Sequence, residues 1–334
     1  MSHQLSSAKT DAAFGEINVS RDREKIEVSF TVLMEPAGEG WQTGVALDGS
    51  SSMRQAYGQI LLGSPSPQIV ESYKSKGLVR TQVQDGHELL YWDNAALQEM
   101  IRSGIYKHSE NIVQQPAREF TAYLAGHLDA DGGTTVIYWA CGAGDQLEVM
   151  GDFTEEQCKL TEFKGPQSAE FGNATMLLPA VKYFVERFRD AENGMYVFIT
   201  DGELNDLAAV KSYTIELCRD IEAGRRKPLK CVLIGFGNQI NEAQMEELDD
   251  LESDTEVDIW DHKIAKDMRS IKDIFAELVC DQIVAPEARI LDSKGRVVKQ
   301  FTDGMPAKVT FTMPPDSTFF TLEVGGQTIK QTIE

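Results

Sequence analysis

The decapeptide GVALDGSSSM, residues 44–53, decides how this chain is interpreted. Its first five residues form an apolar run typical of a buried strand, and they lead directly into a loop of small polar residues. Asp48, Ser50 and Ser52 place one carboxylate and two hydroxyls at alternate positions, so that three oxygens can point at one spot. Oxygen ligands with few carboxylates suit Mg²⁺, which keeps several of its own waters. Asp and Ser are also common turn residues, so the motif alone fits an ordinary turn equally well.

Two later segments favour the metal interpretation. FGNATMLLPAV, residues 171–181, places Thr175 just before an amphipathic helix, and VFITDGELND, residues 197–206, places Asp201 at the end of an apolar strand. The carboxyl ends of parallel strands meet at one edge of a sheet, where ligands bind. Three clusters of acid or hydroxyl side chains, at residues 48–52, at Thr175 and at Asp201, are therefore expected at one edge of the sheet. They favour a metal site, with Mg²⁺ as the expected ion and Mn²⁺ or Ca²⁺ as alternatives.

The order of apolar strands and amphipathic helices predicts the fold class. Between residues 42 and 283 the two alternate, and the strands are nearly continuous apolar runs. This pattern indicates an α/β domain with a doubly wound, mostly parallel, six-stranded sheet of the Rossmann-like kind. Residues 57–111 interrupt it as an insertion beside the metal loop, because they carry turn residues and only one amphipathic piece.

The two ends of the chain follow a different pattern. Residues 14–36 and 286–334 alternate apolar and polar side chains between short turns, which is typical of antiparallel strands. We expect these two segments to combine into one small discontinuous β-sandwich, because neither is large enough to form a stable sheet alone. Residues 1–13 are predicted to be a flexible tail.

Composition limits the function classes. The 334 residues carry a formal net charge of −21, which argues against binding to nucleic acid or to anionic membranes. The amino terminus has no apolar signal segment, and the longest apolar runs are too short to cross a bilayer. The five cysteines are scattered without a CxxC pair, as in a reduced protein. These features predict a cytoplasmic address.

The succession of Asp48, Ser50, Ser52, Thr175 and Asp201 resembles the metal-ion-dependent adhesion site (MIDAS) of von Willebrand factor type A (VWA) domains, over residues 42–283 or so. In that family the first three residues would ligate the metal directly or through water. Thr175 would join or leave the coordination shell, and Asp201 would act through a water. More narrowly, the chain looks like bacterial TerY-type proteins, which are cytoplasmic and associated with stress-response modules. The resemblance implies a non-enzymatic adaptor or scaffold that captures an Asp or Glu of a protein partner, such as a kinase, phosphatase or ATPase.

Two alternatives remain open at this stage. In the first, the metal orients a phosphate group, and the chain is a Mg²⁺-dependent phosphohydrolase or phosphotransferase. Against it, no general base is evident near the motif. In the second, the 57–111 insertion covers the metal and donates a carboxylate of its own, from Asp85, Glu88 or Asp93.

Overall fold

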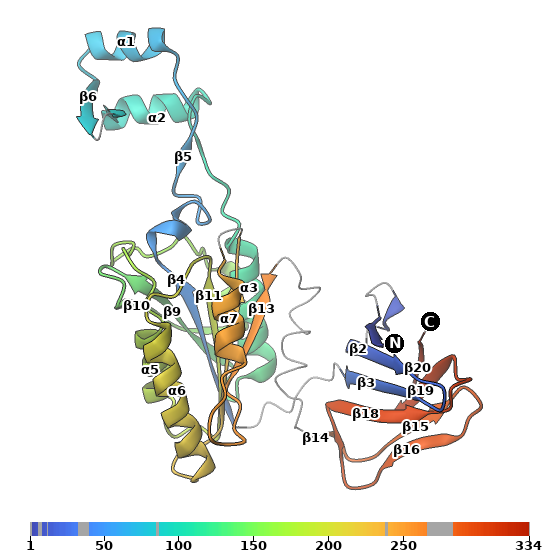
Figure 1. The fold of residues 1–334 in the computed structure, drawn as a ribbon. Helices are drawn as coiled ribbons and strands as arrows, with labels where there is room; N and C mark the ends of the chain where they lie inside the picture. The colour runs from blue at the N-terminus through green and yellow to red at the C-terminus, as the bar shows by residue number, and fades with distance from the viewer. Residues whose placement is uncertain are drawn as a thin grey trace.

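The computed structural model describes residues 2–5, 9–11, 13–32, 40–84, 87–237, 240–265 and 283–333. Ile271, Ile274, Phe275 and Leu278 have helical spacing in the sequence and predict a last helix, which lies outside these ranges. Figure 1 shows a central sheet flanked by helices, an arm that extends from one end of this sheet, and a part built of strands from both chain ends.

The central sheet has six strands in the order β10-β9-β4-β11-β12-β13. The four neighbouring pairs from β9 to β13 are parallel, whereas β10 runs antiparallel to β9 at one edge. The middle strands are buried along almost their whole length, which explains their continuous apolar sequence. The bounds are β4 (Trp41–Asp48), β9 (Gly133–Cys141), β10 (Gln146–Thr154), β11 (Asn193–Thr200), β12 (Leu229–Gly235) and β13 (Trp260–Ile264).

Side chains of the sheet alternate between two apolar cores. Val45 and Leu47 of β4 pack in a core with α3 (Gln114–Tyr123) and the π-helical turn η3 (Leu124–Leu128). Ala46, between them, packs in a second core with three other helices, as the two-residue period of a strand requires. These helices are α5 (Leu178–Arg187), α6 (Leu207–Glu222) and α7 (Glu242–Asp249). A short helix, α4 (Glu155–Leu160), follows β10 and begins with a capping box at Thr154.

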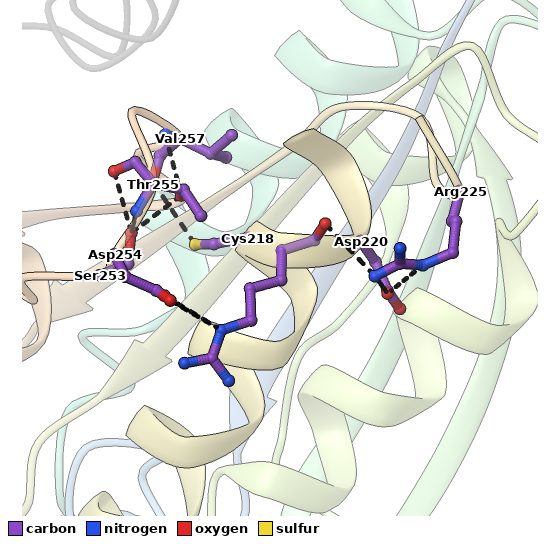
Figure 2. A network of polar contacts seen from close by, with 8 residues as sticks. Cys218, Asp220, Arg225, Ser253, Asp254, Thr255 and Val257 are labelled. Carbon is purple, nitrogen blue, oxygen red and sulfur yellow. Dashed lines mark hydrogen bonds and ion pairs between the residues drawn. The ribbon is translucent and has the colours of Figure 1, made fainter. Parts of the chain in front are cut away.

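The far end of α6 is attached to the loop that precedes β13 by a polar network, which Figure 2 shows from close by. Arg219 Nε donates to Asp254 Oδ1 at 3.0 Å, and the Cys218 thiol lies 3.4 Å from the Val257 carbonyl. Arg225, just beyond the helix, pairs with Asp220. With sixteen residues α6 is about 24 Å long, so this network lies far from the helix start that follows Asp201.

The strands from the two chain ends share one apolar core. One sheet has the order β1-β2-β3-β18 and another the order β16-β15-β19-β20, with a two-stranded β14-β17 sheet beside them. Phe30 and Phe320 stack in the core with ring centroids 5.2 Å apart. The bounds are β1 (Ser2–Gln4), β2 (Phe14–Arg21), β3 (Ile26–Val32), β14 (Ile283–Ala285), β15 (Ala288–Asp292), β16 (Val297–Phe301), β17 (Met305–Pro306), β18 (Lys308–Met313), β19 (Phe319–Val324) and β20 (Gln327–Thr332).

Within residues 1–13, where the sequence predicts a tail, β1 pairs with β2 from Ser2↔Ser20 to Gln4↔Asn18. Leu5 is buried against the same core. The polar composition of this segment did not indicate a strand, because an edge strand gains its stability from backbone hydrogen bonds to its neighbour rather than from its own side chains.

The arm comprises residues 61–108. Its base is a two-stranded pair in which Leu61 faces His108 and Leu62 faces Lys107, and its outer part combines a hairpin with two helices. In Figure 1 it projects from the end of the central sheet at which the loop after β4 lies. Its elements are β5 (Leu61–Leu62), α1 (Pro67–Ser75), β6 (Val79–Gln84), β7 (His87–Trp92), α2 (Asn94–Arg102) and β8 (Lys107–His108).

These observations correct the predicted fold class. The expectation was a doubly wound, mostly parallel α/β sheet with one small sandwich, whereas the described residues form six separate sheets, five of them with only two or four strands. Strands dominate both chain ends and also occur in the arm, so the chain as a whole is a β-rich, multi-sheet protein. The physical reason is that hydrophobic periodicity reports each element separately, whereas the division of strands among sheets is decided by long-range pairing.

Candidate functional site

Asp48 is the buried base of a polar cluster at the carboxyl end of β4. One carboxylate oxygen, Oδ1, accepts from the backbone N–H of Ser50 at 2.7 Å, and the other, Oδ2, accepts from the Thr200 hydroxyl at 2.6 Å. The Tyr57 hydroxyl donates to the Asp48 carbonyl at 2.9 Å. Gly49 allows Pro166 to pack closely against this loop, because a Cβ at this position would lie 2.7 Å from the Pro166 ring. The bonds from Ser50 and Thr200 fix the direction of the Asp48 side chain, and the bond from Tyr57 fixes its backbone carbonyl.

Hydroxyl groups connect Asp48 to the next strand. The Ser50 and Ser52 Oγ atoms lie 2.9 Å apart, and Ser52 donates to Asp201 Oδ1 at 2.7 Å. A Cβ built on Gly202 would lie 3.6 Å from Thr175 Oγ1 and 3.9 Å from Ser52 Oγ. The structure therefore brings all five predicted ligands together. Asp48, Ser50 and Thr175 are buried, whereas Ser52 is exposed on the short 3₁₀ helix η2 (Ser51–Arg54), which leaves one side of the cluster open to solvent.

Hydrogen bonds from the segment that follows Asp201 hold Thr175 in place. The Asn205 side-chain oxygen accepts from Thr175 N at 2.6 Å, and Asn205 N donates to the Thr175 carbonyl at 2.9 Å. Asp206 accepts from Leu177 N and Leu178 N at 2.8 and 2.9 Å, so it satisfies free amides at the start of α5. The segment 201–206 thus supplies one predicted ligand, Asp201. It also supplies Asn205 and Asp206, which position a second predicted ligand, Thr175.

The loop before Thr175 is tied to the loop after Asp48. Ser51 N donates to the Gly172 carbonyl at 2.8 Å, and Gly172 N donates to the Gly49 carbonyl at 2.9 Å. A Cβ at Gly172 would lie 1.8 Å from the Ala140 carbonyl oxygen, so only glycine allows this approach. The two ligand-bearing loops are therefore built as one unit.

The electrostatics of the cluster favour a cation. The pKa of Asp48 is raised to about 7, mainly by burial; the hydrogen bonds from Thr200 and Ser50 act to lower it, and the negative charge of Asp201 acts to raise it. Burial also raises the pKa of Asp201. Two carboxylates that share a poorly solvated site are costly when both are ionised, and a bound divalent cation would compensate this cost.

The donor set fits such an ion. Two carboxylates and three hydroxyls are hard oxygen ligands, which Mg²⁺ and Mn²⁺ accept while keeping waters. Within the described ranges no cluster of three or more His, Cys, Asp or Glu side chains is placed to hold a metal, so a metal here would depend on the Ser and Thr hydroxyls.

The three carboxylates suggested for the insertion have other positions. Asp85 lies outside the described residues. Glu88 pairs with Lys74 at 3.2 Å within the arm, and Asp93 accepts from Ala95 N at 2.9 Å, which caps α2. The structure does not bring Glu88 or Asp93 to the Asp48 cluster.

Sequence reasoning missed four residues that build the site. Thr200, Asn205 and Asp206 lie in the same VFITDGELND segment that drew attention to Asp201, and Tyr57 lies just beyond the metal loop. Their residue types carry a weak signal, because Asn and Asp after a strand are typical of many helix starts. Their contacts could be found only once the chain segments were placed side by side.

Comparisons with known proteins are limited. No family model matches the sequence, and no curated protein matches it. Among solved structures, the chain is similar to the pilus adhesin SpaC of Lactobacillus rhamnosus GG in its open conformation, at 8% identity and a TM-score of 0.36, over 99% of this chain and 48% of that one. It is similar to the PilB minor pilin of Streptococcus sanguinis at 8% identity and a TM-score of 0.36, over 83% of this chain and 86% of that one. It is similar to the pilus adhesin RrgA of Streptococcus pneumoniae at 9% identity and a TM-score of 0.30, over 100% of this chain and 68% of that one.

These findings correct the family expectation. The sequence was interpreted as a VWA protein of the TerY type with a MIDAS, but no family model matches it, and the similar solved structures are pilus adhesins and a minor pilin. The chain spans about half the length of the SpaC chain. The expected role as a cytoplasmic stress-response adaptor is corrected with it. The physical reason is that a five-residue constellation specifies local chemistry, and similar chemistry recurs in chains of different organisation.

None of the helices described here is long and apolar enough to span a membrane.

Proposed function

We propose that this chain is a non-enzymatic, adhesive binding protein whose binding face is the open side of the Asp48 cluster, with a divalent cation held there. The observation that carries the proposal is the hydroxyl bridge from Ser50 through Ser52 to Asp201, with the buried Asp48 carboxylate behind it. Two of the similar solved structures are named pilus adhesins, and an adhesive function of this chain is compatible with those names.

The chemistry of the site explains why binding would depend on the cation. Five side-chain oxygens, only two of them from carboxylates, would leave a bound Mg²⁺ or Mn²⁺ with part of its charge and with coordination positions occupied by water. An oxygen atom of a ligand, such as the carboxylate of an Asp or Glu in a partner protein, can replace such a water in a charge-assisted contact. Ser52 is the exposed member of the set, so this exchange would take place on its side.

The first test measures the cation alone. Titration of the purified chain with Mn²⁺, followed by calorimetry and by the electron paramagnetic resonance of the ion, gives the affinity of the site. We expect Ser52→Ala to weaken Mn²⁺ binding by about tenfold or more, because an exposed ligand is lost without a change in the core. Ser51→Ala is the matched control, since Ser51 is the exposed neighbour that only its backbone connects to the cluster. Equal Mn²⁺ affinity in wild type and Ser52→Ala would falsify the site.

The second test measures ligand capture. An array of short peptides that each contain one Asp or Glu is probed with the labelled protein in Mg²⁺ and in EDTA, and the matching Asn or Gln peptides serve as controls. Binding that requires both Mg²⁺ and the carboxylate, and that Ser52→Ala removes, supports the proposal. Hydrolysis of a phosphate monoester by wild type and not by Ser52→Ala would contradict its non-enzymatic part.

The cytoplasmic address stays the prediction from composition, and it conflicts with the adhesive role proposed here. Cell fractionation with an antibody against the chain distinguishes the soluble lysate from the cell surface, and an adhesive role requires the second location.

A further inference from the structure

The hairpin of the arm has an outer face that no other described element covers. In the register of β6 and β7, Arg80 lies opposite Tyr91 and Gln82 lies opposite Leu89. Directly opposed residues and alternate residues share a face of a sheet, so these four side chains are on the same side. The other side carries Val79, which is buried.

Apolar exposure is concentrated on this hairpin. Among the described residues eight large hydrophobic side chains are exposed, and four of these belong to the arm. Tyr91 and Leu89, which are 50% and 38% exposed, lie on the outer face of the hairpin, whereas Val83, which is 70% exposed, lies on the same face as Val79. The arm is a small fraction of the chain, and exposed apolar groups gathered in one place indicate a binding surface rather than chance.

The arm is also neutral in a strongly acidic protein. Residues 61–108 contain five Lys or Arg and five Asp or Glu, whereas the whole chain has a net charge of −21. The remaining parts therefore carry all of the excess negative charge. A ligand selected by the arm is expected to be uncharged, since the arm provides no net field to attract an ion of either sign.

A shallow pocket of about 540 Å³ lies at the end of the hairpin nearest to α2. Its lining includes Arg80, Gln82, Tyr91, Trp92 and Asp93. Trp92 lies opposite Val79, so its side chain is on the other face of the hairpin, where its ring packs edge to face against Tyr73 of α1.

We propose that this pocket and the outer face around Tyr91 form a second binding site, which takes a neutral saccharide. The C–H face of a sugar ring can lie on the exposed Tyr91 ring, because aromatic rings combine apolar area with a polar edge. Planar polar groups suited to vicinal hydroxyls stand beside it, namely the Arg80 guanidinium, the Gln82 amide and the Asp93 carboxylate. The volume lies in the range for small ligands, whereas a protein partner would need an interface of about 800 Å² per side.

The test screens an array of neutral oligosaccharides with the intact chain and then titrates the strongest sugar by calorimetry, with saturation-transfer difference NMR as a second readout. We expect saturable binding that Tyr91→Ala weakens by about tenfold or more, because the stacking ring is lost. Tyr91→Phe keeps the ring and is expected to bind within about twofold of wild type. Leu160→Ala is the matched control, since Leu160 is 80% exposed on α4 of the central domain.

Each result decides the proposal. Loss of sugar binding in Tyr91→Ala, with wild-type binding in Leu160→Ala and an unchanged circular dichroism spectrum, supports it. No binding across the array, or binding that Tyr91→Ala leaves unchanged, overturns it. Capture of peptides in place of sugars at Tyr91 also overturns it and identifies the face as a peptide site. Because this site is separate from the Asp48 cluster, sugar binding is expected to persist in EDTA and in Ser52→Ala, so its failure is distinguishable from failure of the cation site.

Discussion

The Asp48 cluster and the arm are the two regions for which we propose binding, and they are built in opposite ways. The cluster consists of buried polar groups fixed by hydrogen bonds from three chain segments, and only one side reaches solvent. The arm consists of short local elements, and four of its large apolar side chains are exposed. The difference teaches that a rigid polar site requires a large surrounding core, whereas an exposed aromatic surface can be carried by a hairpin supported by two helices.

The largest expected effect is a loss of stability when a glycine near the Asp48 cluster is replaced by alanine, compared with the same replacement in the arm. Gly172→Ala places a methyl group 1.8 Å from the Ala140 carbonyl oxygen, and a backbone atom cannot move aside as a flexible side chain would. We expect a loss of about 3 kcal/mol or more in the free energy of unfolding. Chemical denaturation followed by tryptophan fluorescence measures it.

Gly77→Ala in the arm is the control. Gly77 has φ +71° with nothing within 4 Å of the added Cβ, so only backbone strain of about 1 kcal/mol is expected. Equal losses for the two variants would mean that the close approach of the loops near Asp48 is not rigid.

A smaller effect compares two capping aspartates. Asp206→Ala removes the acceptor for Leu177 N and Leu178 N at the start of α5, which costs about 1–2 kcal/mol of stability. Because Thr175 immediately precedes this turn, Mn²⁺ affinity is expected to fall by about tenfold. Asp93→Ala removes the equivalent cap of α2 in the arm, and Mn²⁺ affinity should not change. A change of Mn²⁺ affinity in both variants would contradict the separation of the two regions.

The third effect is pH dependence at the edge of the central sheet. The hydrogen bond of 2.6 Å from His262 Nδ1 to Asp249 Oδ2 raises the pKa of His262, with burial acting in the opposite direction. A raised pKa means that the pair stabilises the fold fully below the ordinary histidine pKa of 6.5, and that this contribution is lost as pH rises through the raised value. The stability difference between wild type and His262→Gln should therefore be larger at about pH 5.5 than at about pH 9. Denaturation curves at the two pH values measure it, and no difference between them would argue against the pair.

The smallest effect is expected from removing the arm. Ile60 and Ser109 are already joined at its base, because Ser109 N donates to the Ile60 carbonyl at 2.7 Å. Replacing residues 61–108 by two glycines should therefore leave the central sheet folded and Mn²⁺ affinity within about twofold of wild type, since short closures cost little entropy. Circular dichroism and the Mn²⁺ titration check both. A large change in Mn²⁺ affinity would show that the arm takes part in the cation site.

Individual elements were more predictable than their assembly. The apolar runs GVALD and MYVFIT indicated strands that end at Asp48 and near Asp201, and the structure has β4 ending at Asp48 and β11 at Thr200. The family, the functional class and the whole-chain fold class were wrong, because a few site residues and a strand–helix alternation do not specify how all strands are distributed among sheets. Within the arm, the sequence indicated only the amphipathic piece that became α2, since the other elements are too short to show a period.

The sequence by itself determined which residues could supply metal-binding oxygens, because residue type and spacing decide the chemistry of a side chain: Asp48, Ser50, Ser52, Thr175 and Asp201. Only the tertiary structure decided that Ser52 reaches Asp201, 149 positions away, and that Asn205 and Asp206 position Thr175. It also decided that Tyr91 and Arg80 share an uncovered face. Such contacts depend on strand register and loop packing, which arise from the summed burial of many residues rather than from any local pattern.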